Sequence, residues 1–151
     1  MGHYRGDENT ARALDAFVKL MRASDSVLAR THHVLVAHGL SHSQFGVLEA
    51  LYHVGPMCLS TVASKILKTS GNLTLVVKNL ESRGLVRREQ DAKDRRYFAL
   101  HLTPKGRTLI ARVFPEHSQN IVREMSILSS AEQKELARLC KKLGLGVAAK
   151  K

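Results

Sequence analysis

A mainly helical fold with one small β-hairpin is predicted by three features of this 151-residue sequence. Apolar residues recur at helical spacing along most of the chain, whereas only two short segments have the composition of strands. Hydrophobic residues make up 44% of the chain, which is ample for a folded core. The length is that of about one domain.

The first predicted helix runs from Asp7 to about His38 and contains no proline. Its apolar residues at helical spacing are Ala11, Leu14, Phe17, Val18, Met21, Leu28 and Leu35. At about 1.5 Å per residue such a helix is roughly 45 Å long, more than one small domain can cover. It is therefore expected either to bend at residues 24–26 or to pack against another subunit.

A capping box formed by Ser41 and Gln44 predicts the start of the second helix, and residues 55–56 (Gly-Pro) predict its end. Its predicted buried stripe is Phe45, Leu48, Leu51 and Tyr52. A short helix follows from Leu59, and a turn at residues 68–71 leads into the next helix. The apolar residues of that next helix, spaced so that they fix its inward face, are Leu73, Val76, Val77 and Leu80.

Residues 85–88 and 97–102 are the two predicted strands, and a charged loop joins them. Thr103 and Pro104 then start a long helix as N-cap and first helical residue, and Pro115 marks a place where this helix can bend. The last predicted helix begins at Ser130. Its predicted buried residues are Leu136, Leu139, Cys140 and Leu143.

The charge of the chain favours a polyanionic partner. There are 24 basic and 13 acidic residues, which gives a net charge of +11. Residues 65–107 alone hold 11 basic and 4 acidic residues, so most of the excess lies in about a quarter of the chain. Lys and Arg docked on phosphates release condensed counterions, so such a cluster favours nucleic-acid binding. Aromatic residues make up only 5% and Trp is absent, which disfavours base stacking on single strands.

The order helix, helix, turn, helix, strand, basic loop, strand is that of a winged helix-turn-helix. The N-terminus of its second helix offers backbone N–H groups to a phosphate, and the exposed polar face after it fits a major groove. The loop offers an arginine to the adjacent minor groove, and Asp94 is expected to pair with a neighbouring arginine and aim the loop. The predicted DNA-contacting residues are Thr69, Ser70, Gly71, Asn72, Thr74, Leu75, Lys78, Asn79, Asp94, Arg95 and Arg96.

The segments LSHSQFGVLEAL, LSTVASKILKTSGNLTLVVKNLESRGLVRRE and DAKDRRYFALHLTPKG resemble the MarR family of bacterial transcriptional regulators. The resemblance implies a DNA-binding lobe at residues 39–107 and helical dimerisation segments at residues 1–38 and 108–151. It also implies a homodimer on a palindromic operator, usually a repressor, often released by a small anionic phenolic ligand or by oxidation. Arg95 then has the wing-tip role in the minor groove, supported by Asp94 and Arg96.

Three regulatory sites are weaker hypotheses. A pocket between the first helix, the second helix and the DNA-binding lobe has as candidate residues Phe17, Met21, His32, Phe45 and Phe114, each of which is equally a core residue. Cys58, expected at the N-cap of the helix from Leu59, is either a passive small residue or a redox-sensitive thiol. Five histidines between residues 32 and 53 raise zinc sensing as an alternative, although their spacing predicts no metal site.

Other classes of protein are disfavoured. No P-loop, nucleophile elbow or clustered acid pair is present, so neither an enzyme nor a cofactor is predicted. No signal peptide and no long apolar run are present, and Cys58 and Cys140 are 82 positions apart, which favours a soluble cytoplasmic protein without a structural disulfide. An architectural DNA-binding protein without an effector and a protein-binding winged helix are the remaining rivals.

Overall fold

The computed structural model describes residues 4–66 and 70–146. Within them the chain forms six helices and one three-stranded sheet, which confirms the predicted fold class. The elements in chain order are α1 (Glu8–Ala37), α2 (His42–Val54), β1 (Met57–Cys58), α3 (Leu59–Ile66), α4 (Ser70–Ser82), β2 (Val86–Gln90), β3 (Phe98–Leu102), α5 (Pro104–Met125) and α6 (Ser130–Leu145).

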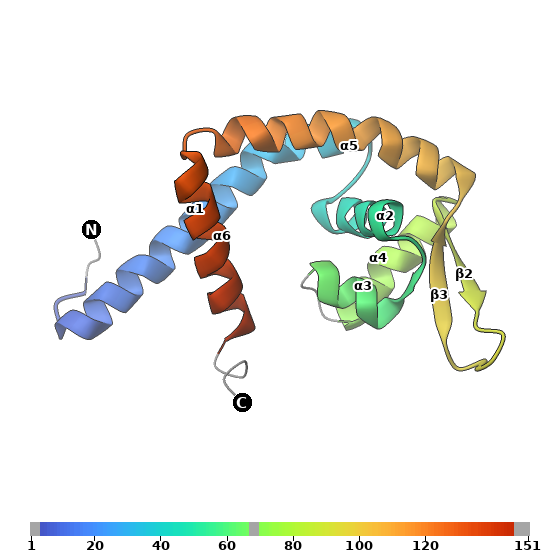
Figure 1. Cartoon of the computed structure of the whole chain (residues 1–151), viewed down its shortest axis with the longest axis horizontal. Coiled ribbons are helices and arrows are strands. Elements are labelled where there is room, and N and C mark those ends of the chain that lie inside the picture. Colours follow the sequence, from blue (N-terminus) through green and yellow to red (C-terminus); the bar gives the residue numbers. More distant parts are fainter. Residues whose placement is uncertain (1–3, 67–69, 147–151) are drawn as a thin grey trace.

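The chain has a compact lobe and a long helical arm (Figure 1). The lobe contains α2, α3, α4 and the sheet, and the first half of α5 covers it. The arm contains most of α1, the end of α5 and α6, and it extends away from the lobe. Because α5 belongs to both parts, and packs against α1 and α2, it connects the position of the lobe to that of the arm.

Helix α1 runs unbroken through residues 24–26. Asp7 caps its N-terminus, where the carboxylate accepts a hydrogen bond from the Thr10 amide at 2.9 Å. In α2 the predicted capping box is present: the Ser41 hydroxyl accepts from the Gln44 amide at 3.1 Å, and the Gln44 side chain accepts from the Ser41 amide at 2.9 Å. Of the long α1 helix, only residues near its C-terminal end are buried, namely Thr31, Val34 and Leu35.

The sheet is antiparallel with strand order β1-β3-β2. Strand β1 was not predicted, because two residues are too few to give a periodic pattern; Met57 pairs with Leu100 across it. The predicted strand at residues 85–88 was displaced and too short. The Leu85 amide donates to the Leu80 carbonyl at 2.9 Å and closes the turn at Gly84, so β2 begins one residue later and pairs as far as Gln90.

The start of α5 is fixed tightly against the end of the turn before β2. Thr103 is the N-cap as predicted: its hydroxyl accepts from the Gly106 amide at 3.0 Å and donates to the Gly84 carbonyl at 2.6 Å. A methyl group at Gly106 would collide with the Leu85 carbonyl, so this close approach requires glycine. Pro115 lies inside α5 without ending it.

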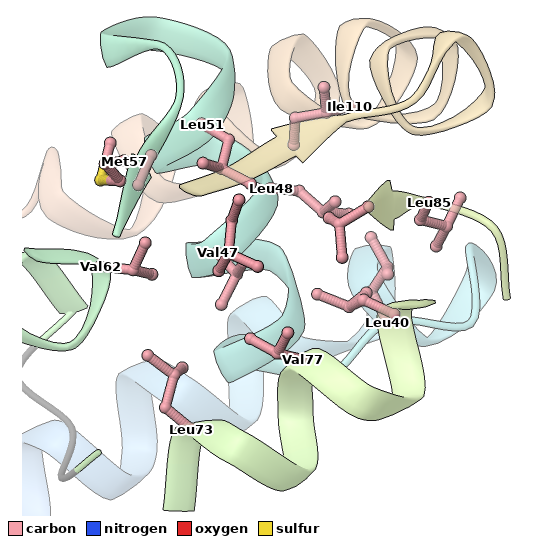
Figure 2. Packing of buried hydrophobic residues seen from close by; sticks show 14 of the residues in the cluster. Leu40, Val47, Leu48, Leu51, Met57, Val62, Leu73, Val77, Leu85 and Ile110 are labelled. Atoms are coloured by element: carbon pink, nitrogen blue, oxygen red, sulfur yellow. The ribbon is translucent and has the colours of Figure 1, made fainter. Parts of the chain in front are cut away.

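The hydrophobic core lies in the lobe and is shared by the ends of the arm helices that enter it (Figure 2). It extends from Leu35 of α1 to Val113 of α5. The predicted inward face of α4 is confirmed: Leu73, Val77 and Leu80 are fully buried, and Val76 is half-buried. This packing leaves the opposite face of α4 exposed.

Helix α6 corrects one prediction. Its apolar stripe was expected to be buried, but in the single chain Leu139 is 47% exposed, Leu143 is 64% exposed and Cys140 is exposed. No residue of α6 is buried, because α6 lies on the arm and away from the lobe's core. With α1 it borders an apolar groove of about 350 Å³ whose lining includes Phe17, Leu20, Leu136, Leu139, Cys140 and Leu143.

Among the helices that the structure describes, none has the length and apolar character needed to cross a bilayer.

Candidate nucleic-acid interface

Helix α4 presents the predicted groove-facing residues. Ser70 and Gly71 are its first two residues. The predicted turn at residues 68–71 was therefore wrong for these two, which belong to the helix. Thr69 lies outside the described residues. The backbone amides of this first turn lack partners within the helix and carry its positive dipole end, which is suited to a phosphate.

The outward face of α4 is polar with one apolar residue in it. Asn72, Lys78 and Asn79 are exposed, whereas Thr74 is half-buried. Leu75 is 73% exposed, an unusual position for a leucine on a helix that packs into a core. The exposed residues lie along successive turns of one helix, as a major-groove reader requires.

Two contacts that the sequence did not predict hold α4 in the lobe. The Gln44 amide nitrogen donates to the Asn79 side-chain oxygen at 2.7 Å, so the capping box of α2 is tied directly to α4. The Arg88 guanidinium pairs with the Glu81 carboxylate at 3.0 Å and joins β2 to α4. The helix and the hairpin therefore hold a fixed relation to each other.

The loop between β2 and β3 is braced by Asp94, as predicted. Its carboxylate accepts from the Arg96 Nε at 3.0 Å, from the Arg96 Nη2 at 2.8 Å and from the Arg96 backbone amide at 3.1 Å. The side-chain hydrogen bond from Arg96 holds the pKa of Asp94 below its ordinary value. The Asp91 carboxylate accepts from the backbone amides of Lys93 and Asp94, which closes the turn before it.

Arg95 lies between these anchored residues. Its carbonyl accepts from the Gln90 amide nitrogen at 2.6 Å, so its backbone is fixed. Its side chain is exposed, and within the described residues no carboxylate pairs with it. The loop thus holds one arginine with its own carboxylate and presents the other without one, which suits insertion of Arg95 into a minor groove of high negative potential.

Comparisons with known proteins agree with this geometry. The MarR family model matches residues 40–98. Two proteins of Bacillus subtilis (strain 168) are similar to nearly the whole of this chain. They are the uncharacterised HTH-type transcriptional regulator YkoM and the HTH-type transcriptional regulator MhqR. YkoM is 39% identical over 92% of this chain and 90% of its own length, and MhqR is 36% identical over 90% and 94%. The chain belongs to the MarR family.

A solved structure extends this likeness to three dimensions. The structure of Bordetella bronchiseptica BpsR, whose DNA binding is regulated by 6-hydroxynicotinic acid, has a TM-score of 0.76 and 27% identity, covering 85% of this chain and 98% of that one. The shared fold is that of a winged helix-turn-helix regulator. MarR-family membership makes this chain a DNA-binding transcriptional regulator.

The five residues predicted for an effector pocket do not converge in the single chain. Phe17 is 60% exposed and lines the groove with α6, and Met21 is 46% exposed on the arm. His32 is about 11 residues further along α1, roughly 16 Å away at helical rise. Phe45 and Phe114 pack against the core of the lobe, and a row of rings connects Phe45 to His32 at the junction of α1, α2 and α5. Phe17 and Met21 lie away from this junction, because helical spacing alone cannot tell where a 30-residue helix leaves the lobe. A pocket at His32 and Phe45 stays a prediction.

A row of imidazole rings occupies the junction between α1, α2 and α5. His32 stacks on His42 with ring centroids 5.0 Å apart, and His42 is 6.2 Å from the ring of His117. Phe45 meets His117 edge-on at 4.6 Å. His117 and Asn120 are buried, and the His32 Nδ1, His117 Nδ1 and Asn120 Nδ2 atoms have no hydrogen-bond partner among the described residues. In the described part of the chain no three His, Cys, Asp or Glu residues are arranged to hold a metal ion.

Stability is expected to fall below neutral pH because of His117. Burial, together with the charges of His42 and His33, lowers the pKa of His117 from its ordinary 6.5. Below pH 6.5 the unfolded chain therefore binds a proton that the folded chain does not, so stability falls as the pH decreases toward the folded pKa. Thermal unfolding midpoints between pH 7.5 and 5.5 should decline less steeply for His117→Phe than for the wild type. The matched control is His53→Phe, which removes an exposed imidazole; equal slopes for the wild type and His117→Phe would contradict the prediction.

Cys58 directly precedes Leu59, the first residue of α3, which is the position expected for its N-cap, and it is also the last residue of β1. Its sulfur is 3.2 Å from the Ser60 hydroxyl and 3.1 Å from the Thr61 hydroxyl. These hydrogen bonds, Ser60 first, lower the pKa of the thiol to about 7. The thiol lines a pocket of about 240 Å³ that Arg88, Arg96 and Tyr97 also line, at the base of the wing.

Proposed function

We propose that the protein is a cytoplasmic homodimeric repressor that binds a pseudo-palindromic operator and is released by a small aromatic acid. The observation that supports it most is the lobe's combination of an exposed polar α4 face with a wing loop in which Asp94 holds Arg96 and leaves Arg95 unpaired. A surface that binds DNA only through its general positive charge does not require such a fixed arrangement of the two arginines. Residues 39–107 then act as the DNA-binding lobe, and residues 1–38 and 108–151 as the dimerisation region.

The proposed DNA contacts divide between two grooves. The amides of Ser70 and Gly71 bind a phosphate, Asn72, Thr74 and Lys78 contact base edges or backbone in the major groove, and Leu75 meets a thymine methyl. Asn79, tied to Gln44, belongs to the same face. In the minor groove Arg95 makes the contact, while Asp94 and Arg96 position it. Thr69 stays a predicted phosphate contact.

Dimerisation is proposed from the exposed apolar surface of the arm. Phe17 on α1, Val122 on α5 and Leu143 on α6 are each at least 60% exposed. Large exposed apolar surfaces mark interaction sites, and the two-fold symmetry of a dimer matches a pseudo-palindrome. In such a dimer the half-sites are about one helical turn apart.

A solved relative supports the proposed effector class. BpsR is regulated by 6-hydroxynicotinic acid, a hydroxylated aromatic acid, and shares 27% identity with this chain. The proposed site is the junction of α1, α2 and α5, where buried nitrogen atoms of His32, His117 and Asn120 lack partners and can bond an acid or hydroxyl group.

The test is to select genomic DNA fragments that bind the purified protein, and then to measure their release by hydroxylated aromatic acids, oxidants and zinc. A selected pseudo-palindrome released by an aromatic acid supports the proposal. A ratio of specific to nonspecific affinity near one would instead identify an architectural DNA-binding protein. Release by zinc alone would replace the aromatic acid with a metal effector.

Oxidation of Cys58 is a second candidate signal, which the lowered thiol pKa of about 7 favours. At pH 7.5 most of the thiol is then ionised, whereas an ordinary cysteine is mostly protonated. Iodoacetamide is expected to alkylate Cys58 with a rate midpoint near pH 7 and to weaken operator binding, since the added group lies at the wing base. Cys58→Ser should retain operator binding after the same treatment, and Cys140→Ser is the matched control. Equal loss of binding in the treated Cys58→Ser protein would remove Cys58 from the regulation.

A further inference from the structure

A basic pocket lies where the end of α1, the end of α4 and the start of α5 meet. Its cavity is about 490 Å³, within the range of small-molecule sites. Its polar lining residues are His38, Arg83, Lys105, Thr108 and Arg112, and its apolar lining residues are Leu85, Pro104 and Leu109. The proposed effector site at the His32–His117 junction uses none of these residues, and neither does the proposed DNA contact surface.

Two of the three cations of this pocket, Arg83 and Lys105, are held by backbone carbonyls and not by carboxylates. The Arg83 Nη1 donates to the Gly39 carbonyl at 2.8 Å, and the Lys105 Nζ donates to the Arg83 carbonyl at 2.8 Å. Within the described residues, neither of them nor Arg112 forms an ion pair. Each therefore keeps its full positive charge and further N–H donors at the cavity.

One acidic residue lies beside the pocket. The Glu116 carboxylate is 3.0 Å from the His38 Nε2, and Glu116 is one turn along α5 from Arg112. Without His38 in the count, three cations and one carboxylate leave a formal excess of two positive charges at the pocket. A ligand that balances this excess is a dianion, and the fork geometry of arginine matches the oxygen atoms of phosphate or carboxylate groups.

The apolar lining adds a second requirement. Leu109 is half-buried and Pro104 is exposed, so these two residues offer apolar contact beside the charged groups, whereas Leu85 is 2% exposed and adds almost no accessible area. A fully hydrated inorganic ion gains nothing from this surface, whereas an organic group attached to the anion removes apolar area from water.

We propose that this pocket binds a small organic dianion, a phosphate monoester or a dicarboxylate, with its charged groups on Arg83, Lys105 and Arg112 and its apolar part against Pro104 and Leu109. The bound dianion joins the lobe, through Arg83, to α5, through Lys105 and Arg112. It therefore stabilises the arrangement of lobe and arm that the structure shows.

The location is distinct from the DNA-contact surface. Arg83 directly follows α4, whose 13 residues extend roughly 18 Å from their proposed DNA-binding N-terminus. In Figure 1 α5 covers the side of the lobe opposite to the tip of the wing. A ligand here acts on the position of the lobe and does not compete with DNA for Arg95.

The test is titration calorimetry of the full chain with phenyl phosphate, in the absence of DNA. Saturable binding of one molecule per chain is expected, and Arg112→Gln and Lys105→Gln should each weaken it about fivefold or more. Lys134→Gln, which removes one exposed charge from α6, is the matched control and should change the affinity less than twofold. Absence of saturable binding, or equal weakening by the control, would overturn the proposal.

Three further ligands define the chemistry. Phthalate binding more tightly than phenyl phosphate would assign the site to dicarboxylates, and the reverse order would assign it to phosphate monoesters; both support the dianion. Benzoate, a monoanion, and inorganic phosphate, which has no apolar part, are expected to bind at least fivefold more weakly, and equal affinity of either would overturn the proposal.

Because no DNA is present, the result is independent of operator recognition. Weakening of duplex binding by Arg112→Gln to the same degree as by Arg95→Ala would show that the pocket contacts DNA, and would also overturn it.

Discussion

Replacement of Leu139 by Asp is expected to convert the proposed dimer into a monomer of 16.7 kDa and to weaken operator binding by about 100-fold or more. The loss of affinity follows from bivalency. Two linked lobes bind two half-sites with an effective concentration that a single lobe lacks, and avidity of this kind contributes about 10²–10⁴.

The choice of Leu139 rests on its surroundings. It is 47% exposed in the single chain, and it lines the apolar groove with Phe17 and Leu20 of α1. In a dimer that covers this groove, a carboxylate at position 139 would be transferred from water to an apolar contact without a partner, which is strongly unfavourable. The core of the lobe does not include α6, so the lobe should stay folded.

The measurement is light scattering coupled to size exclusion, together with operator affinity and thermal unfolding. Lys134→Asp, on the same helix and also exposed, is the matched control and should remain dimeric. A Leu139→Asp protein that stays dimeric with unchanged affinity would show that the α6 stripe is not the interface. Loss of the lobe's unfolding transition in this variant would instead show that α6 stabilises the fold of the lobe.

The elements of the lobe could be predicted from the sequence because local patterns determine them. The capping box at Ser41, the Thr103-Pro104 start of α5 and the inward face of α4 each depend on residues within one or two turns. The Asp94–Arg96 pair was also local, since its two members are two positions apart. In these places propensity, capping and hydrophobic pattern agree, so the prediction and the structure agree.

The sequence failed where the partner of a segment lies far away along the chain. Strand β1 exists because Met57 pairs with Leu100, more than 40 positions later along the chain. A strand of two residues has no sequence pattern that would indicate this pairing. The Gln44–Asn79 bond has the same origin. Burial of Cys140 was expected from an apolar stripe, but a stripe shows only that a helix needs a partner, not that its own chain supplies it.

The candidate site divides in the same way. Exposure of Asn72, Lys78 and Arg95 followed from the pattern of their apolar neighbours, and the structure agrees. The histidine row and the pocket at Arg83 combine residues from three elements each, so spacing could not predict either. The proposed DNA contacts each lie within one helix or one loop and could be predicted from the sequence, whereas the proposed regulatory sites form only where several elements meet.

Replacement of Arg95 by Ala is expected to weaken operator binding by about tenfold or more for each half-site. It should also reduce the slope of log affinity against log salt concentration by about one for each half-site. Arg95 is exposed, and its backbone is fixed by the Gln90 hydrogen bond, so it can enter a minor groove without first being ordered. Removal of its charge also removes the counterion release that accompanies each phosphate neutralised, and the salt slope detects this separately from affinity.

Arg87→Ala is the matched control, because Arg87 is an exposed arginine of the same hairpin whose guanidinium pairs with Glu89 at 2.6 Å. Its loss also deprives the Glu89 carboxylate of its guanidinium partner and leaves only the His101 Nε2, 3.4 Å away, beside it. Any generic effect of charge on the hairpin should therefore be at least as large in this variant as in Arg95→Ala. If Arg95→Ala weakens binding at least tenfold more than Arg87→Ala, the position of Arg95 at the tip matters and not merely its charge. Equal effects of the two substitutions would show that the wing binds DNA only through its general positive charge. The positioning of Arg95 by Asp94 and Arg96 would then have no part in recognition.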